Sequence, residues 1–252
     1  MTTGVKDRVA LVTGAGRGIG KATVELLKAG GARVFGVARN ERELAELGVD
    51  YAVADLGTAE GCARAVEEAS RPFGRIDIFI CNHGLGSAHE DVVWKQKKST
   101  WRESMAINLD GPFYLSRLIL AGMVERSWGR VVYTSSTAAQ VAEYGGCAYN
   151  SAKTGLLGLM RSVARDAGPY GITSNAVLPG WVRTEMAERS ARAEAEQRGI
   201  TPEQVWEERG AMYPPGRVVT PGEVAATIFF LASQEASGIS GQAISVALGA
   251  PE

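Results

Sequence analysis

The sequence predicts an α/β protein in which about seven parallel strands form one doubly wound sheet with helices on both faces. Short, continuously apolar runs such as residues 9–12 are typical of strands that are buried on both sides. These runs alternate with helical patterns along the whole chain. No internal repeat, low-complexity segment or linker interrupts the alternation, so we expect a single domain over residues 1–252.

The boundaries of the individual elements lie where the hydrophobic pattern changes its period or where Gly, Pro or a capping residue interrupts it. We expect strands at residues 9–12, 33–37, 49–54, 76–80, 130–134, 172–178 and 243–246. Helices are expected at about residues 19–28, 58–70, 100–125, 149–166, 185–210 and 221–231. The segment at 185–210 is highly charged and departs from the strict alternation of strand and helix.

Composition excludes several classes of function. Hydrophobic residues make up 45% of the chain and charged residues 22%, and the formal net charge is -1, which argues against a nucleic-acid or anionic-membrane partner. No apolar run reaches the roughly 18 residues of a membrane-spanning helix. Three widely spaced cysteines and a polar start of the chain predict a cytoplasmic protein with reduced thiols. Only two histidines, His83 and His89, are present, so we expect no metal site.

A glycine-rich turn follows the first predicted strand and opens the first predicted helix. Gly14, Gly18 and Gly20 allow the backbone to turn tightly and to approach a pyrophosphate, and the unpaired N–H groups of the helix N-terminus bind that charge. A strand, such a turn, a helix and a second strand within about thirty residues are the context of a dinucleotide site. The sequence therefore predicts a Rossmann-type nucleotide-binding sheet.

A second group of candidate residues follows the fifth strand. Ser136 comes directly after that strand, and Tyr149 and Lys153 are four residues apart, so they share one face of a helix. A nearby ammonium lowers the pKa of a phenol because it favours the phenolate. We therefore expect Tyr149 to have a lowered pKa and to serve as a general acid/base, with Ser136 bonded to a substrate oxygen.

With these motifs in view, the whole chain resembles the classical short-chain dehydrogenase/reductase (SDR) family. The resemblance rests on the glycine-rich turn, on Asn82 and Gly84 after the fourth strand, and on the Ser136, Tyr149 and Lys153 spacing. It extends to the segments around Asn108 and after the sixth strand. The resemblance implies hydride transfer between a nicotinamide and the carbon of a ketone or secondary alcohol, with no metal.

The resemblance also implies the roles of individual residues. It implies the catalytic group Asn108, Ser136, Tyr149 and Lys153, in which Lys153 bonds the nicotinamide ribose and Asn108 holds a water that links Lys153 to solvent. The expected cofactor-binding residues are Gly14, Arg17, Gly18, Ile19, Gly20, Arg39, Asp55, Leu56, Asn82, Gly84, Tyr149, Lys153, Pro179, Gly180, Val182 and Thr184. Relatives are tetramers, so we expect a homotetramer that acts on a small molecule.

Cofactor choice depends on the residues at the end of the second strand. NAD-dependent relatives usually carry an acid there for the ribose 2′-hydroxyl. This chain has Ala38 and Arg39 instead, and Arg39 and Arg17 can pair with a 2′-phosphate. We therefore expect NADP(H), and the alternative, in which both arginines face solvent, leaves NAD(H) possible.

The sequence indicates the substrate less clearly than the cofactor. Residues 183–217 occupy the position of the family's substrate lid, and residues 197–205 resemble the lid of 3-hydroxybutyrate dehydrogenases. Gly86, Ala138 and Gly146 stand where those relatives contact a carboxylate, and none of them can make such contacts. The candidate pocket residues are Glu143, Tyr144, Trp181 and Met186, each of which could instead be a packing residue.

Three functions therefore compete. The first is an NADP-dependent ketoreductase or alcohol dehydrogenase, and the second is an NAD-dependent, 3-hydroxybutyrate-like hydroxy-acid dehydrogenase. The third is a nucleotide-binding regulator without catalysis, which the presence of all four catalytic residues disfavours. His83 stands where relatives have a small residue, and we expect a packed, neutral ring there.

Overall fold

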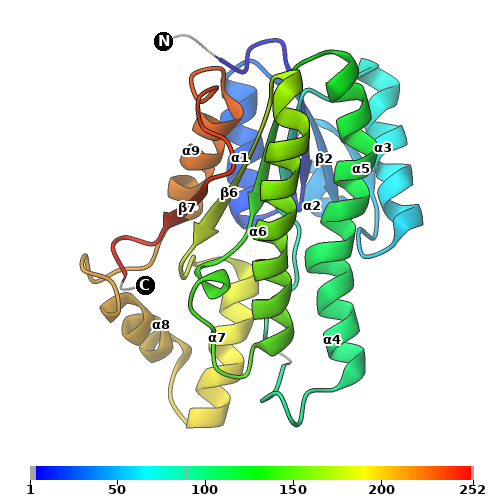
Figure 1. The fold of residues 1–252 in the computed structure, drawn as a ribbon. Coiled ribbons are helices and arrows are strands. Elements are labelled where there is room, and N and C mark those ends of the chain that lie inside the picture. Colours follow the sequence, from blue (N-terminus) through cyan, green and yellow to red (C-terminus); the bar gives the residue numbers. More distant parts are fainter. Residues whose placement is uncertain (1–3, 89, 251–252) are drawn as a thin grey trace.

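The computed structural model describes residues 4–88 and 90–250, and His89 lies outside the described residues. It confirms the predicted fold class. Seven parallel strands form one sheet in the order β3-β2-β1-β4-β5-β6-β7, with helices on both faces (Figure 1). The strands are β1 (Val9–Thr13), β2 (Arg33–Ala38), β3 (Asp50–Val53), β4 (Ile78–Cys81), β5 (Gly129–Thr134), β6 (Ile172–Pro179) and β7 (Ala243–Val246).

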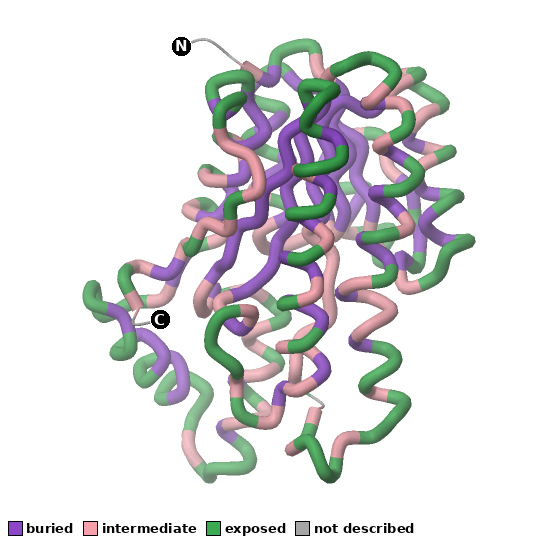
Figure 2. Tube along the Cα trace, in the orientation of Figure 1, coloured by how far each residue is buried: buried purple, intermediate pink, exposed green. Residues whose placement is uncertain are grey.

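Two helical layers cover the sheet. On one face, α3 (Ala59–Phe73), α5 (Gly111–Glu125) and α6 (Cys147–Ala167) pack on the strands through one hydrophobic cluster. On the other face, α1 (Gly18–Ala29) and α9 (Pro221–Ala232) pack through a second cluster. Figure 2 shows the strands buried between these layers. Because the central strands are covered on both faces, they are apolar without alternation, which explains the continuous apolar runs in the sequence.

The predicted helix at 100–125 is interrupted. The structure has α4 (Lys98–Met105), then a π-helical turn (Ala106–Asp110), and then α5. A π turn holds one residue more than an α turn and often marks a functional position. The sequence gives no sign of it, because its helical pattern continues through the turn. Asn108 lies in the middle of the π turn and is buried.

The charged segment predicted at 185–210 consists of two helices, α7 (Glu185–Arg198) and α8 (Pro202–Ala211). Gly199 ends α7 in the left-handed conformation, with φ of 65°, and Thr201 starts α8 with a capping box that includes Gln204. The segment is therefore helical as predicted, but it is divided into two helices at Gly199. Both helices lie beyond the carboxyl edge of the sheet, at the lower end of Figure 1.

A short helix, α2 (Glu41–Ala45), was not predicted. Asn40 caps it by accepting a hydrogen bond from the Arg42 N–H at 3.2 Å. Five residues are too few for a helical period to be recognisable in the sequence. This helix places Glu43 beside the glycine-rich turn.

The N-terminus of α6 depends on a side chain from a distant loop. Its N-cap, Gly146, has no side chain to cap the helix. The carboxylate of Glu90 instead accepts hydrogen bonds from the N–H groups of Ala148 at 2.7 Å and Tyr149 at 2.9 Å. A negative charge at this position also interacts favourably with the positive end of the helix dipole. Glu90 therefore holds the first turn of the helix that carries Tyr149 and Lys153.

No helix among the described residues is long and apolar enough to cross a membrane. Within the same residues, no group of three or more His, Cys, Asp or Glu side chains is arranged to hold a metal ion.

The Glu90 cap leads to a prediction on stability. Glu90→Ala removes both hydrogen bonds and the charge, so it should lower the free energy of unfolding by about 1 to 2 kcal/mol. Denaturant unfolding measures this change. The matched control is Glu207→Ala, at an exposed position of α8, which should stay within about 0.5 kcal/mol of the parent protein. Equal stability of the two variants would show that Glu90 contributes nothing to the helix.

Candidate functional site

A cavity of about 550 Å³ runs along the carboxyl edge of the sheet. It starts at the glycine-rich turn after β1, passes the ends of β2, β3 and β4, and reaches the start of α6. Its lining includes Gly14, Arg17, Gly18, Ile19, Arg39, Asp55, Leu56, Asn82, Gly84, Ser136, Tyr149, Lys153, Pro179, Gly180, Val182 and Thr184. The structure thus brings to one cavity nearly all of the residues singled out in the sequence.

The glycine-rich turn forms an open cradle at one end of the cavity. Gly14 and Gly18 have φ values of 63° and 53°, which favour glycine. A Cβ on Gly18 would lie 3.0 Å from Cγ2 of Thr184. No side chain caps the start of α1, which leaves its first N–H groups facing the cavity side of the turn. These features fit the pyrophosphate of a dinucleotide.

Gly20 has a different position from the one expected. It does not line the cavity but packs against the turn itself, where a Cβ would collide with the Gly14 carbonyl oxygen. Its lack of a side chain keeps α1 close to the turn, so it shapes the cradle from behind. Contact between Gly20 and a bound cofactor therefore stays a prediction.

The ends of β1, β4 and β5 are joined by side-chain hydrogen bonds. The Asn82 N–H donates to Thr13 Oγ1 at 3.0 Å, and Asn82 Nδ2 donates to the Gly14 carbonyl at 3.3 Å. Thr134 Oγ1 donates to Asn82 Oδ1 at 3.2 Å. Asn82 therefore ties the glycine-rich turn to the strand that leads to Ser136.

His83 is packed beneath this junction. Its Nδ1 lies 2.8 Å from Thr13 Oγ1. Burial, followed by the charge of Lys153, lowers the pKa of His83 to about 3. The ring is thus neutral near neutral pH, and the expectation of a packed, neutral histidine is confirmed.

Ser136, Tyr149 and Lys153 lie together at the other end of the cavity. Tyr149 accepts or donates a hydrogen bond with the Ser136 side chain, and Lys153 Nζ lies 5.7 Å from the centre of the Tyr149 ring. Lys153 Nζ donates to the Thr134 carbonyl at 2.9 Å. The last residue of β5 therefore orients the ammonium, and one turn of α6 presents the phenol beside it.

The pKa expected for Tyr149 is wrong for this structure. Burial raises the pKa of Tyr149 to about 12, and the charges of Glu143 and Glu90 raise it further, whereas the hydrogen bond with Ser136 lowers it. Burial also lowers the pKa of Lys153 to about 8. The cost of placing charge in a buried site exceeds the attraction between the two groups, because Lys153 is turned toward a carbonyl.

Asn108 lies behind the cavity wall. Its Nδ2 donates to the Leu85 carbonyl and its Oδ1 accepts from the Leu85 N–H, each at 3.0 Å. A Cβ on Gly84 would lie 3.0 Å from Asn108 Oδ1 and 3.4 Å from Lys153 Nζ. Asn108 therefore fixes the loop after β4, and the bare backbone of Gly84 keeps open the space between Asn108 and Lys153.

The end of β2 carries both positive and negative groups. Arg39 is exposed and lines the cavity, while Arg17 bonds Glu185 at 2.7 Å and lies 3.7 Å from Glu43. Glu43 also lines the cavity. The end of β2 itself has no acidic residue, but α2 brings Glu43 to the same region. The only sign of this helix in the sequence is Asn40, since asparagine is a preferred N-cap residue.

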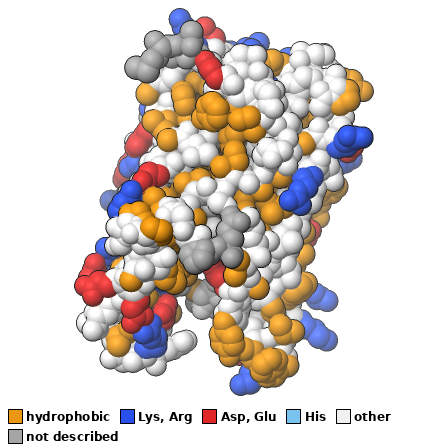
Figure 3. All heavy atoms as spheres, turned by 60° about the vertical axis from the view of Figure 1, so that its left-hand side comes forward, with side chains coloured by type: hydrophobic (Ala, Val, Ile, Leu, Met, Phe, Trp, Pro, Cys, Tyr) orange, Lys and Arg blue, Asp and Glu red, His pale blue; other side chains and the backbone are white. Residues whose placement is uncertain are grey.

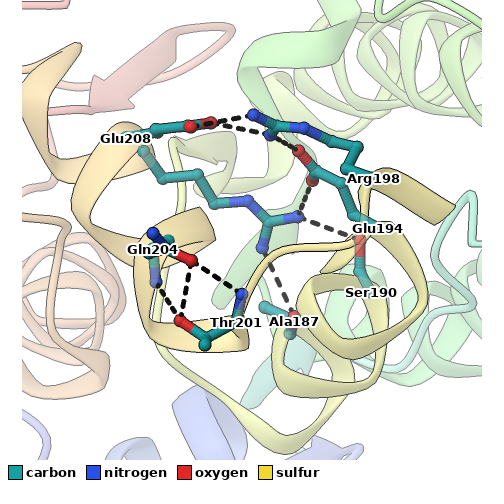
Figure 4. A network of polar contacts seen from close by, with 8 residues as sticks. Ala187, Ser190, Glu194, Arg198, Thr201, Gln204 and Glu208 are labelled. Atoms are coloured by element: carbon teal, nitrogen blue, oxygen red, sulfur yellow. Dashed lines mark hydrogen bonds and ion pairs between the residues drawn. The ribbon is translucent and has the colours of Figure 1, made fainter. Parts of the chain in front are cut away.

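Helices α7 and α8 are held together by a network of ion pairs and hydrogen bonds. Arg209, which is buried, donates to Glu194 at 2.9 Å, to Ser190 at 3.2 Å and to the Ala187 carbonyl, and it stacks on Trp181 at 3.6 Å. Figure 4 shows Glu194 between Ser190 and Arg198, and Arg198 in turn pairs with Glu208. The network fixes α7, whose inner side borders the cavity, against α8.

The candidate substrate residues divide into two groups. Glu143, Trp181, Met186 and Gly86 line the cavity, whereas Tyr144 is 93% exposed and lies outside it. Figure 3 shows a hollow at the lower end of the molecule, between two projecting parts. Ser87 lines the cavity and Glu90 supports Tyr149, yet neither was singled out, because each acts through contacts with residues more than fifty positions away.

Comparisons with known proteins agree with this geometry. Residues 14–250 match the family model described as enoyl-(acyl carrier protein) reductase. The chain is 34% identical to a 3-oxoacyl-(acyl-carrier-protein) reductase of Vibrio cholerae over 96% of each chain. It is also 34% identical to a D-beta-hydroxybutyrate dehydrogenase of Cupriavidus necator, over 94% of this chain and 95% of that one.

A solved structure shares the fold closely. A variant of actinorhodin polyketide ketoreductase with NADPH superposes with a TM-score of 0.90 at 30% identity, over 96% of this chain and 97% of that chain. The two relatives and this structure are oxidoreductases that act on hydroxyl or carbonyl groups. The chain is therefore a member of the classical short-chain dehydrogenase/reductase family.

Proposed function

We propose that this protein is an NADP-dependent ketoreductase or alcohol dehydrogenase in which Tyr149 is the general acid/base. The observation that supports the proposal most directly is the position of Tyr149. Its phenol bonds Ser136 and lies beside Lys153, at the far end of a cavity that begins in a dinucleotide cradle. When bound, the nicotinamide supplies or accepts the hydride.

Each of the four polar residues has a distinct task in this proposal. Ser136 donates a hydrogen bond to the substrate oxygen, and Tyr149 gives that oxygen a proton in reduction or removes it in oxidation. Lys153 returns a proton to Tyr149, and it would also bond the nicotinamide ribose of the bound cofactor. Asn108 positions the loop of Gly84 and Leu85, so that the space beside Lys153 stays open to the water that completes the proton path.

A cofactor with a 2′-phosphate is favoured by the exposed guanidinium of Arg39 and by Arg17, both at the cavity wall. The NADPH of the actinorhodin ketoreductase supports the same choice. Glu43 opposes it, since a carboxylate at this position repels a phosphate and accepts a bond from a 2′-hydroxyl. The ion pair with Arg17 and a bond from Asn40 at 2.8 Å hold this carboxylate in place.

The proposal further treats residues 1–252 as one domain with a substrate lid at about 183–217. As in its relatives, we expect the protein to be cytoplasmic and homotetrameric. An NAD-dependent hydroxybutyrate dehydrogenase is the second candidate, supported by the Cupriavidus necator relative. Gly86 at the cavity wall offers no side chain to a substrate carboxylate, which favours the first candidate.

Tyr149→Phe should lower kcat/KM for ketone reduction by about 100- to 10,000-fold, because it removes the acid/base and leaves the ring in place. NADPH absorbance with a panel of ketones, 3-oxoacyl thioesters, secondary alcohols and sugars measures the effect. The control is Tyr144→Phe, the same change at an exposed position outside the cavity. Retention of most activity by Tyr149→Phe would refute the proposed acid/base.

The pH dependence should follow Lys153. Its pKa is lowered to about 8, so the ammonium that restores the proton is lost as pH rises through that value. We expect kcat/KM for NADPH, measured at saturating ketone, to be level below this pKa and to fall about tenfold per pH unit above it. A profile that remains level well above the pKa of Lys153 would contradict its role in the proton path.

Cofactor preference should respond in opposite directions to two substitutions. Arg39→Asp should shift the ratio of kcat/KM for NADPH over NADH toward NADH by about tenfold or more, because it removes the partner of the 2′-phosphate. Glu43→Gln should shift the ratio toward NADPH, because it removes a repelling charge. Arg42→Asp, at an exposed arginine outside the cavity, is the control. A parent protein with better turnover on NADH would refute the choice of NADP.

A further inference from the structure

The substrate end of the cavity contains a carboxylate that none of the proposed catalytic steps uses. Glu143 lies in the loop between β5 and α6 and lines the cavity together with Ser136 and Tyr149. Ser87 Oγ, from the loop after β4, donates to Glu143 Oε2 at 3.2 Å. Its charge is close enough to Tyr149 to raise the pKa of the phenol. Any substrate that reaches Tyr149 therefore comes close to Glu143.

No cation forms an ion pair with this carboxylate among the described residues. Arg209 is the cation that lowers the pKa of Glu143, but burial outweighs it and raises that pKa overall. The guanidinium of Arg209 is already engaged by Glu194, by Ser190 and by the face of Trp181. The negative charge of Glu143 is thus left for a ligand to balance.

The hydrogen-bonding capacity of Glu143 is also incompletely used. A carboxylate accepts about four hydrogen bonds, and in the described part of the chain Ser87 is the only donor to it. The loop after β4 and α7 add Gly86, Ala88, Met186 and Ala187 to the wall of the cavity, and none of these side chains donates a hydrogen bond. A half-buried acceptor of this kind binds hydroxyl or ammonium groups and repels anions.

We propose that Glu143 determines the substrate class: carbonyl compounds or alcohols that carry a hydrogen-bond donor, a hydroxyl or ammonium group, next to the reacting carbon. It selects against substrates with a carboxylate at that position. This inference rests on the proposed reaction and adds the polarity of the substrate to it. Selection against a carboxylate by Glu143 is also a reason to distinguish this protein from hydroxy-acid dehydrogenases.

Besides the catalytic Lys153, a further cation at the cavity wall has to be considered. Arg189, on the exposed side of α7, lines the cavity and is the group that would bind a carboxylate if the substrate had one. Arg17 and Arg39 belong to the cofactor end. If Glu143 sets the specificity, the enzyme disfavours a substrate with a carboxylate. If Arg189 sets it, the enzyme prefers such a substrate.

Four small ketones test the inference: butanone, acetoin, acetoacetate and methyl acetoacetate. Acetoin adds a hydroxyl to butanone, and acetoacetate differs from its ester by the negative charge. The parent protein should prefer acetoin to butanone, and the ester to acetoacetate, each by about tenfold in kcat/KM. Glu143→Gln, which removes the charge, should abolish the discrimination against acetoacetate. Glu143→Met, which removes the acceptors as well, should abolish the preference for acetoin.

Two controls accompany these variants. Glu125→Gln makes the same chemical change at an exposed end of α5 and should leave both ratios unchanged. Arg189→Gln should leave both ratios within about twofold of the parent values, since Glu143 sets them. Unchanged ratios in both Glu143 variants would overturn the inference. A parent preference for acetoacetate that Arg189→Gln abolishes would also overturn it.

A binding measurement separates this inference from the proposed reaction. Calorimetry of the four ketones with the NADP-bound Tyr149→Phe protein gives the same two ratios as dissociation constants, without turnover. If the parent protein reduces none of the ketones but the binding ratios depend on Glu143 as expected, the reaction is wrong and the substrate class stands. If turnover depends on Tyr149 but the ratios ignore Glu143, the reaction stands and the substrate class is wrong.

Discussion

The site depends on the reversal of strand order between β1 and β4. From β1 the chain proceeds outward through β2 and β3, and it then returns to place β4 on the other side of β1. The connections therefore leave these two neighbouring strands in opposite directions, which opens a crevice at their carboxyl ends. Thr13 and Asn82 join the strands across that opening. The glycine-rich turn and the loop of Gly84 thus face the same space.

Burial governs the electrostatics at the other end of this crevice. It raises the pKa of Tyr149 to about 12, lowers that of Lys153 to about 8 and lowers that of His83 to about 3. In each case the first cause is the loss of hydration of the charged form, and the interactions between neighbours are smaller. The phenol of Tyr149 and the ring of His83 are therefore neutral near neutral pH, whereas Lys153 is still largely an ammonium below its pKa of about 8.

Two long-range contacts position α6 and the loop after β4. Glu90 caps α6 from 58 residues upstream of Ala148, and Asn108 in the π turn fixes Leu85 from 23 residues downstream. Both residues act on the backbone, so their effect on Tyr149 and Lys153 is one of geometry. The contacts of Arg209 likewise fix α7 against α8.

Local patterns in the sequence determined the sheet of seven strands, the dinucleotide turn and the grouping of Ser136 with Tyr149 and Lys153. Each is a matter of period or short spacing, which neighbouring residues impose on the backbone directly. Only the tertiary structure decided the raised pKa of Tyr149, the π turn at Asn108, the place of Glu43 at the cavity wall and the cap that Glu90 forms on α6. These features depend on burial and on contacts between distant segments. The order of residues along the chain does not say how close such segments lie in space.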